Sequence, residues 1–318
     1  GSTDLAAGWL AGCEAVARHA ATAQDAARGH VLVLSDGQAN QGIVDPSRLA
    51  AIASDLRQRA VTTSTVGIGD GYAPVHLQTL AEAGGGRMHD AERTDDLATV
   101  LLGELGAART TTVENLVVHV DLPEGVQARV YGTAPLSGLA RELRIVLGAL
   151  ASGGQRTVVL PLHFPARREH AELVLGVRLR WQEPGAQDVR ELVLPPCTVG
   201  FANGQDVRLE ARDPLLASVV LQHWYDHAVH TAMAQNQTGD GQAAADYLGR
   251  ELHWFERYSQ FVPQGAELVA SLRRLQQSVH RPYAPRAAKE ALLGSYKRTR
   301  GERDLRTGRP EPGLFGGW

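Results

Sequence analysis

The sequence predicts an α/β fold at its N-terminal end, followed by an all-β sandwich and then a C-terminal α-helical bundle. Changes in hydrophobic periodicity along the 318 residues support this division. Strand and helix patterns alternate over residues 1–110, strand patterns alone occur over residues 111–205, and helical patterns alone occur over residues 206–303. Residues 304–318 are rich in Pro and Gly, and we expect them to form a flexible tail.

The first region is predicted to be part of a doubly wound parallel sheet, because strands and helices alternate along it. A continuous apolar run at 30–35 predicts a strand that is covered on both faces. The β-branched run at 61–69 predicts the next strand, and a third, short strand is expected at 87–90. Helical spacing predicts the intervening helices, at residues 4–20, 47–60, 74–83 and 95–107.

The second region predicts an antiparallel sandwich, because short strand patterns are separated by Pro, Gly and Asn. The expected strands span residues 113–120, 127–131, 142–147, 156–164, 172–181 and 189–194. The third region predicts antiparallel helices with short connections, over residues 214–234, 242–261, 266–280 and 286–300. Four aromatic residues are expected in the core of this bundle: Trp224, Tyr225, Trp254 and Phe255.

Composition excludes several classes of function. The formal net charge is -3, so the chain lacks the excess positive charge that binds nucleic acid or an anionic membrane. No apolar run approaches the ~20 residues that a membrane span needs, and no signal peptide is visible, so cytoplasm is the default expectation. The two cysteines, Cys13 and Cys197, lie too far apart in the sequence to suggest a disulfide framework or a zinc site.

Polar residues follow the first two predicted strands. Asp36 and Gly37 end the strand at 30–35, Asp70 follows the strand at 61–69, and Thr3 and Asp4 open the first helix. Open α/β sheets bind ligands at the carboxyl ends of their strands, and hydroxyl and carboxylate oxygens are the ligands that Mg²⁺ prefers. Three simpler roles stay open: Asp36 in a plain turn, Thr3 as a helix N-cap, and Asp70 as a loop cap.

Four segments, GSTDL, VLVLSDGQAN, TTSTVGIGD and AEAGGG, resemble in their order the C-terminal half of a bacterial von Willebrand factor type A domain. The later regions resemble the tails of bacterial chains that carry this domain at their front, with a motif like GSYKRTRG at 294–301. The resemblance implies a metal-ion-dependent adhesion site in which Thr3 and Asp36 are Mg²⁺ ligands. It also implies a protein partner that offers an acidic group, and a binding module rather than an enzyme.

The sequence departs from that family in one respect. It contains no Asp-x-Ser-x-Ser motif, and the half of the domain with the central strand, which by analogy pairs with residues 30–35, is missing. We therefore expect weak or no Mg²⁺ binding by this chain, because Mg²⁺ demands a near-octahedral ligand shell. A fragment of a longer protein is the simplest explanation, and a split domain completed by another chain is the alternative.

Two other functions stay open. The first is an α/β hydrolase or nucleotide-using enzyme that employs Asp36 and Asp70, although G-x-S-x-G and a complete phosphate loop are missing. The second is a structural scaffold that acts through the sandwich and the bundle. His223 and His227 have the i, i+4 spacing of a zinc chelate, but a structural helix face is favoured because no third ligand is evident.

Overall fold

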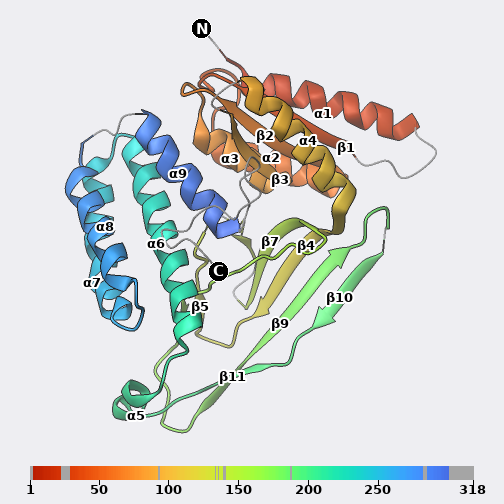
Figure 1. The fold of residues 1–318 in the computed structure, drawn as a ribbon. Coiled ribbons are helices and arrows are strands. Elements are labelled where there is room, and N and C mark those ends of the chain that lie inside the picture. Colours follow the sequence, from red (N-terminus) through yellow and green to blue (C-terminus); the bar gives the residue numbers. More distant parts are fainter. Residues whose placement is uncertain are drawn as a thin grey trace. The chain divides into compact units, whose positions relative to one another are not determined.

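The predicted fold class is confirmed by a computed structural model, which describes residues 3–22, 29–91, 94–132, 134, 136–138, 141–186, 188–281 and 285–300 (Figure 1). A three-stranded parallel sheet with helices is followed by antiparallel strands and then by C-terminal helices. The predicted tail at 304–318 lies outside the described residues. The three predicted domain boundaries stay predictions.

The chain folds as two compact units, each built from several segments. Unit 1 comprises Gly1–Val120, Ala134–Gln155 and Val177–Leu194. Unit 2 comprises Asp121–Thr133, Arg156–Gly176 and Pro195–Trp318.

The parallel sheet of unit 1 has the order β1-β2-β3, with β1 at Gly29–Ser35, β2 at Val61–Ile68 and β3 at Gly85–Ala91. Parallel neighbours need crossover connections, and here α2 (Pro46–Gln58) and α3 (Pro74–Ala83) supply them. Ser35 pairs with Gly67, so β1 and β2 end beside each other. Among the described strands β1 pairs only with β2, which makes it an edge strand.

Two further helices, α1 (Leu5–Thr22) and α4 (Thr94–Thr110), pack on this sheet. On α1, Leu5, Trp9 and Cys13 are buried and recur every four residues, so they form one buried face of the helix. The Trp9 indole Nε1–H donates to Thr63 Oγ1 on β2 at 3.1 Å, which satisfies its polar atom in the core. On α4, Val100 packs against a buried cluster of the sheet, formed by Val66 and Ala91.

The antiparallel strands form a sheet in the order β10-β9-β4-β7-β6, with β11 paired to β9. Its strands are β4 (Thr111–Asp121), β6 (Leu136–Ser137), β7 (Glu142–Ala151), β9 (Glu172–Gln182), β10 (Val189–Val193) and β11 (Cys197–Gly200). A separate pair joins β5 (Gln127–Ala128) to β8 (Leu162–His163). The long strand predicted at 156–164 was wrong, because only Leu162–His163 forms a ladder and prolines at 161 and 165, which lack a backbone N–H, bracket it.

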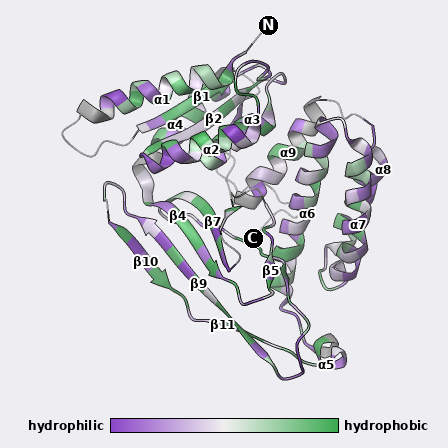
Figure 2. Cartoon of the chain, turned by 180° about the vertical axis from the view of Figure 1, so that it is seen from behind, coloured by the Kyte–Doolittle hydropathy of each residue, from purple (hydrophilic) through white to green (hydrophobic). Residues whose placement is uncertain are grey.

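Unit 2 contains five helices among the described residues: α5 (Gly204–Leu209), α6 (Pro214–Gln237), α7 (Gly241–Ser259), α8 (Gly265–Ser278) and α9 (Pro285–Arg300). The side chain of Asp213 caps α6 by accepting from the N–H groups of Leu215 and Leu216. Helix α6 packs against α7 and α9, and α7 packs against α8. Figure 2 shows hydrophilic and hydrophobic residues alternating along these helices, as expected for helices that bury one face.

Two of the four predicted core aromatics are buried as expected, and Trp224 is partly buried. Phe255 and Tyr225 are buried, and the Trp224 Nε1–H donates to Glu251 Oε2 at 2.6 Å. The prediction for Trp254 was wrong, because its side chain is 59% exposed. The buried stripe of α7 passes through other positions: Ala244, Leu248, Leu252, Phe255 and Ser259.

The GSYKRTRG segment attaches α9 to α6. Tyr296 is fully buried, and Ser295 Oγ donates to the Asp226 carbonyl at 2.7 Å. The Arg298 guanidinium donates to Asp226 Oδ1 from Nε at 2.9 Å and from Nη2 at 2.7 Å. Within unit 2 these residues therefore have a packing role.

The helical histidines of α6 also lie against protein groups. His223 Nδ1 lies 3.0 Å from the Val219 carbonyl of its own helix, and His227 Nδ1 accepts from the Gly132 N–H at 3.3 Å. Of the helices in the described part of the chain, none is both long and apolar enough to traverse a bilayer.

Candidate functional site

Three loops meet at the carboxyl ends of β1 and β2. Thr3 Oγ1 lies 3.1 Å from the point where a Cβ on Gly37 would stand, so the loop before α1 touches the turn after β1. The Asp36 carbonyl oxygen lies 2.7 Å from the corresponding point on Gly71, so the turn after β2 touches the turn after β1. The structure thus brings together the loops that carry Thr3, Asp36 and Asp70. We call this edge the strand-end rim.

Hydrogen bonds fix the backbone of Thr3 but do not involve its side-chain hydroxyl. Its N–H donates to Asn40 Oδ1 at 2.8 Å, and its carbonyl accepts from the N–H groups of Asn40 at 3.3 Å and Gln41 at 3.2 Å. Thr3 Oγ1 has no hydrogen-bond partner among the residues that the structure describes. The backbone of Thr3 is therefore held in place, and its hydroxyl oxygen remains available to a ligand.

Asp4 takes the helix-capping role that the sequence left open to Thr3. Its Oδ1 accepts from the Ala7 N–H at 2.9 Å, at the first turn of α1. The same carboxylate fills the space beside Gly42, whose φ of 70° favours glycine. A side chain at Gly42 would displace Asp4, so Asp4 joins α1 to the loop after β1.

Asp36 is exposed at the turn that ends β1. The turn is closed by Ser35, whose Oγ donates to the Gly37 carbonyl at 3.2 Å. The Asp36 carboxylate itself forms no hydrogen bond or ion pair with any described residue. The rim therefore presents a carboxylate and a hydroxyl on touching loops, both without partners among the described residues.

Asp70 lies on the turn after β2. The Gln38 side chain, which no pattern in the sequence singled out, joins this turn to the turn after β1. Gln38 Nε2–H groups donate to the carbonyls of Gly71 and Tyr72, each at 2.8 Å. Tyr72 is buried against Gly67, and its hydroxyl donates to Asp90 Oδ1 at 2.8 Å. Burial and the neighbouring Asp90 carboxylate raise the pKa of Tyr72, so its phenol stays protonated and keeps this bond.

The oxygen donors at the rim fit a hard cation in type but not in number. Thr3 Oγ1 and the Asp36 carboxylate are the oxygen ligands that Mg²⁺ prefers, whereas Mg²⁺ takes about six ligands in total. In the described part of the chain, no three side chains from His, Cys, Asp and Glu gather as a metal-binding group. The rim by itself supplies only part of a coordination shell.

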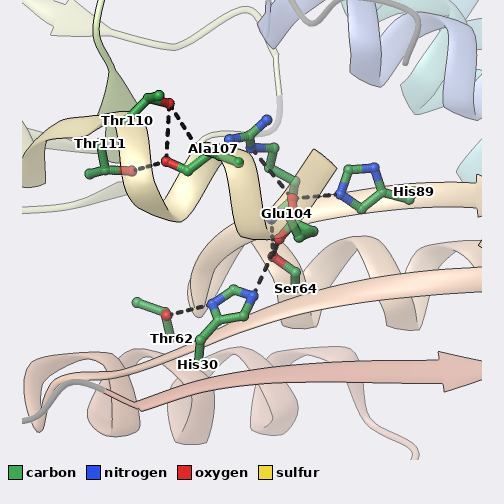
Figure 3. A network of polar contacts seen from close by, with 10 residues as sticks. His30, Thr62, Ser64, His89, Glu104, Ala107, Thr110 and Thr111 are labelled. Atoms are coloured by element: carbon green, nitrogen blue, oxygen red, sulfur yellow. Dashed lines mark hydrogen bonds and ion pairs between the residues drawn. The ribbon is translucent and has the colours of Figure 1, made fainter. Parts of the chain in front are cut away.

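A second polar cluster of unit 1 surrounds Glu104 on α4 (Figure 3). Glu104 Oε2 accepts from Ser64 Oγ at 2.5 Å and lies 3.3 Å from His30 Nε2. Glu104 Oε1 lies 2.8 Å from His89 Nε2 and 3.8 Å from Arg87 Nε. Burial acts to raise the pKa of Glu104, but the hydrogen bonds from the two imidazoles and Ser64 outweigh it and leave that pKa below its usual range.

This cluster has the residue types of a hydrolytic triad without its connectivity. A triad requires the imidazole to touch the serine hydroxyl and the carboxylate to touch the other ring nitrogen. Here Ser64 and His89 both bond to Glu104 instead, and Ser64 is fully buried. The cluster thus links α4 to all three strands of the parallel sheet, through His30, Ser64 and His89.

Sequence comparison matches no family model and no curated protein. Structural comparison matches "von Willebrand factor type A from Catenulispora acidiphila" with a TM-score of 0.59 and 16% identity, covering 90% of this chain and 68% of that chain. This chain has that fold. The resemblance found in the sequence is therefore confirmed at the level of the fold, which is what a match of such low identity shows.

Two other solved structures match less well. The ArnB paralog VWA2 from Sulfolobus acidocaldarius gives a TM-score of 0.45 and 14% identity, over 84% of this chain and 63% of that chain. Proximal thread matrix protein 1 from the mussel byssus, described with a zinc occupied MIDAS motif, gives a TM-score of 0.23 and 22% identity, over 29% of this chain and 23% of that chain.

Proposed function

We propose that this chain is a protein-interaction module that binds an acidic group of a partner through a divalent cation at the strand-end rim. One observation carries the proposal: the Thr3 hydroxyl and the Asp36 carboxylate lie in touching loops and have no partner among the described residues. They stand where open α/β sheets bind their ligands. The von Willebrand factor type A fold supports the same assignment.

In this proposal Thr3 and Asp36 hold one side of an Mg²⁺ ion, and Asp70 borders the site. A bound Mg²⁺ would supply a hard, oxygen-seeking charge that attracts a carboxylate. Asn40 positions Thr3, and Gln38 holds the Asp70 turn, so the protein fixes these oxygens before a ligand arrives. The remaining ligand positions would be filled by water and by the partner.

We further propose that the rim binds rather than catalyses. A nucleophile needs a base within hydrogen-bonding reach. In the buried cluster around Glu104, Ser64 and His89 each bond to the carboxylate and not to each other. Asp36 and Asp70 are exposed and stand beside glycines, which leaves room for a partner's side chain.

Calorimetric titration of the full chain with millimolar Mn²⁺ tests the metal site. Mn²⁺ serves here as a probe for Mg²⁺. We expect weak binding, with a dissociation constant of roughly 1 mM, that is lost in Asp36→Ala and reduced in Thr3→Ala. Asp55→Ala is the matched control, because Asp55 is an exposed acid of the same unit and lies away from the rim on α2. Binding by Asp36→Ala that equals binding by the wild type would contradict the proposal.

A further inference from the structure

We propose a second, metal-independent docking surface on the helices of unit 2, which binds an acidic protein segment that also carries aromatic or aliphatic side chains. The surface consists of Arg212, Trp254, Arg257, Tyr258 and Phe261, and we call it the arginine–aromatic patch. Arg212 lies just before α6, and the other residues lie at the end of α7 and in the turn after it; the two helices pack against each other.

The aromatic residues of the patch follow one line along α7. Trp254, Tyr258 and Phe261 are spaced at i, i+4 and i+7, so they lie on the same side of the helix and of the turn that ends it. Trp254 is 59% exposed and Phe261 is 52% exposed, although α7 buries its other face in the bundle. Large exposed aromatic side chains in a group are typical of interaction sites.

The two arginines lie over these rings. Arg212 Cζ is 4.8 Å from the Tyr258 ring centroid and 4.4 Å from the Phe261 ring centroid, and Arg257 Cζ is 5.5 Å from the Trp254 centroid. A guanidinium that stacks on rings through its faces keeps its N–H edge for a carboxylate. Neither arginine forms an ion pair with a carboxylate of the described residues.

Three acidic residues near the patch already have other partners. Glu251 accepts from the Trp224 indole, Glu256 pairs with Arg273 at 2.9 Å, and Asp213 caps α6. None of these three carboxylates forms an ion pair with Arg212 or Arg257, whose N–H edges stay available to a partner. Leu215 and Leu216, three and four positions after Arg212 in the chain, are also exposed, at 61% and 65%.

These features favour an acidic protein segment as the occupant. Trp, Phe, Tyr and Arg are enriched in protein interfaces, and such anchors supply most of the binding energy. Two cations are too few for a nucleic-acid footprint, which depends on many phosphate contacts. Carboxylates of the partner would meet the arginine edges, while its apolar side chains would cover Trp254 and Phe261.

Binding of a fluorescein-labelled peptide, in which Glu alternates with Phe and Leu, to the full chain tests the patch by fluorescence anisotropy. The measurement is made in EDTA, so it is independent of the rim and of the metal proposal. We expect the double variant Arg212→Glu/Arg257→Glu to weaken binding at least about tenfold. Trp254→Ala should weaken it several-fold, and raising the salt concentration should weaken binding to the wild type.

Matched controls separate the patch from general stickiness. Arg18→Glu reverses an exposed arginine of unit 1, and Leu102→Ala removes a side chain of unit 1 that is 70% exposed; both should bind as the wild type does. Circular dichroism checks that the variants fold. Equal binding of a peptide with Lys in place of Glu, or unchanged binding by the double arginine variant, would overturn the proposal. The proposal would also be overturned if the patch bound phosphatidylserine vesicles but not the peptide. The same holds if the chain formed a dimer that buries the patch.

Discussion

Glu104 and Asp36 are two carboxylates of the same unit in opposite surroundings. Glu104 is 9% exposed and is surrounded by donors from all three strands of the parallel sheet. Asp36 is exposed and has no partner among the described residues. A buried charge must be paired to be tolerated, whereas an exposed charge needs no partner and can serve a ligand. The difference separates a residue that supports the fold from one that is free to bind.

Asp226 in unit 2 is a carboxylate that is buried more deeply than Glu104. It is 1% exposed, and its carboxylate meets the Arg298 guanidinium and the Gln222 amide. Burial raises the pKa of Asp226 despite the opposing charge of Arg298, whereas the pKa of Glu104 is lowered. The balance between burial and the surrounding donors therefore decides whether a buried carboxylate favours its charged form.

Removal of Glu104 should have the largest effect. In Glu104→Ala the donors of Ser64 and His89 lose their buried acceptor, and we expect the free energy of unfolding to fall by about 3–5 kcal/mol. Urea unfolding followed by circular dichroism measures this change. Asp55→Ala, which removes only an exposed ion pair with Arg59, should cost less than about 1 kcal/mol. A loss of similar size in both variants would show that Glu104 is not the link we describe.

The dependence of stability on pH should be the next largest effect. The folded-state pKa of Glu104 is lowered, so its contribution is fully present above the unfolded value of about 4.3 and is lost as the pH falls through the folded value. Urea unfolding between about pH 3 and pH 7 should therefore show a steeper acid loss in the wild type than in Glu104→Gln. Parallel curves would mean that Glu104 does not carry this dependence.

Substitution of Gly71 should distort the strand-end rim without removing any side chain from the core. A Cβ at this position would stand 2.7 Å from the Asp36 carbonyl, so Gly71→Ala forces the two turns apart and should cost about 1–3 kcal/mol. Gly8→Ala is an opposite control, because Gly8 lies in α1 with nothing within 4 Å of a Cβ, and it should stabilise by up to about 1 kcal/mol. Both changes can be read from thermal unfolding. An unchanged Gly71→Ala variant would mean that the turns are not held in contact.

Asp36→Ala should have the smallest effect on stability. The carboxylate has no partner among the described residues, so we expect the free energy of unfolding to change by no more than about 0.5 kcal/mol. The same variant should lose Mn²⁺ binding. A destabilisation as large as that of Glu104→Ala would assign Asp36 a structural role and remove the contrast between the two carboxylates.

The elements of the fold were largely predictable because they depend on local patterns. Helix α3 was predicted at its observed bounds, and β1 and β2 within one residue, since apolar runs, Pro at helix starts and Gly at strand ends act locally. The short strand β6 was missed, because Leu136–Ser137 has too few residues to show a period and is defined by its pairing with β7. Trp254 was misplaced, because an aromatic residue in a helix suggests burial unless the neighbouring helices are known.

The sequence alone determined which residues stand at the strand ends, because a strand that stops on Ser35 and a turn at Asp36 are encoded side by side in the chain. Only the tertiary structure decided what those residues do. Thr3 Oγ1 faces Gly37, Asp4 rather than Thr3 caps α1, and Gln38 clamps the turn that bears Asp70. Glu104 likewise meets Ser64 across 40 positions of sequence. Such contacts depend on the packing of distant segments, and no local pattern records them.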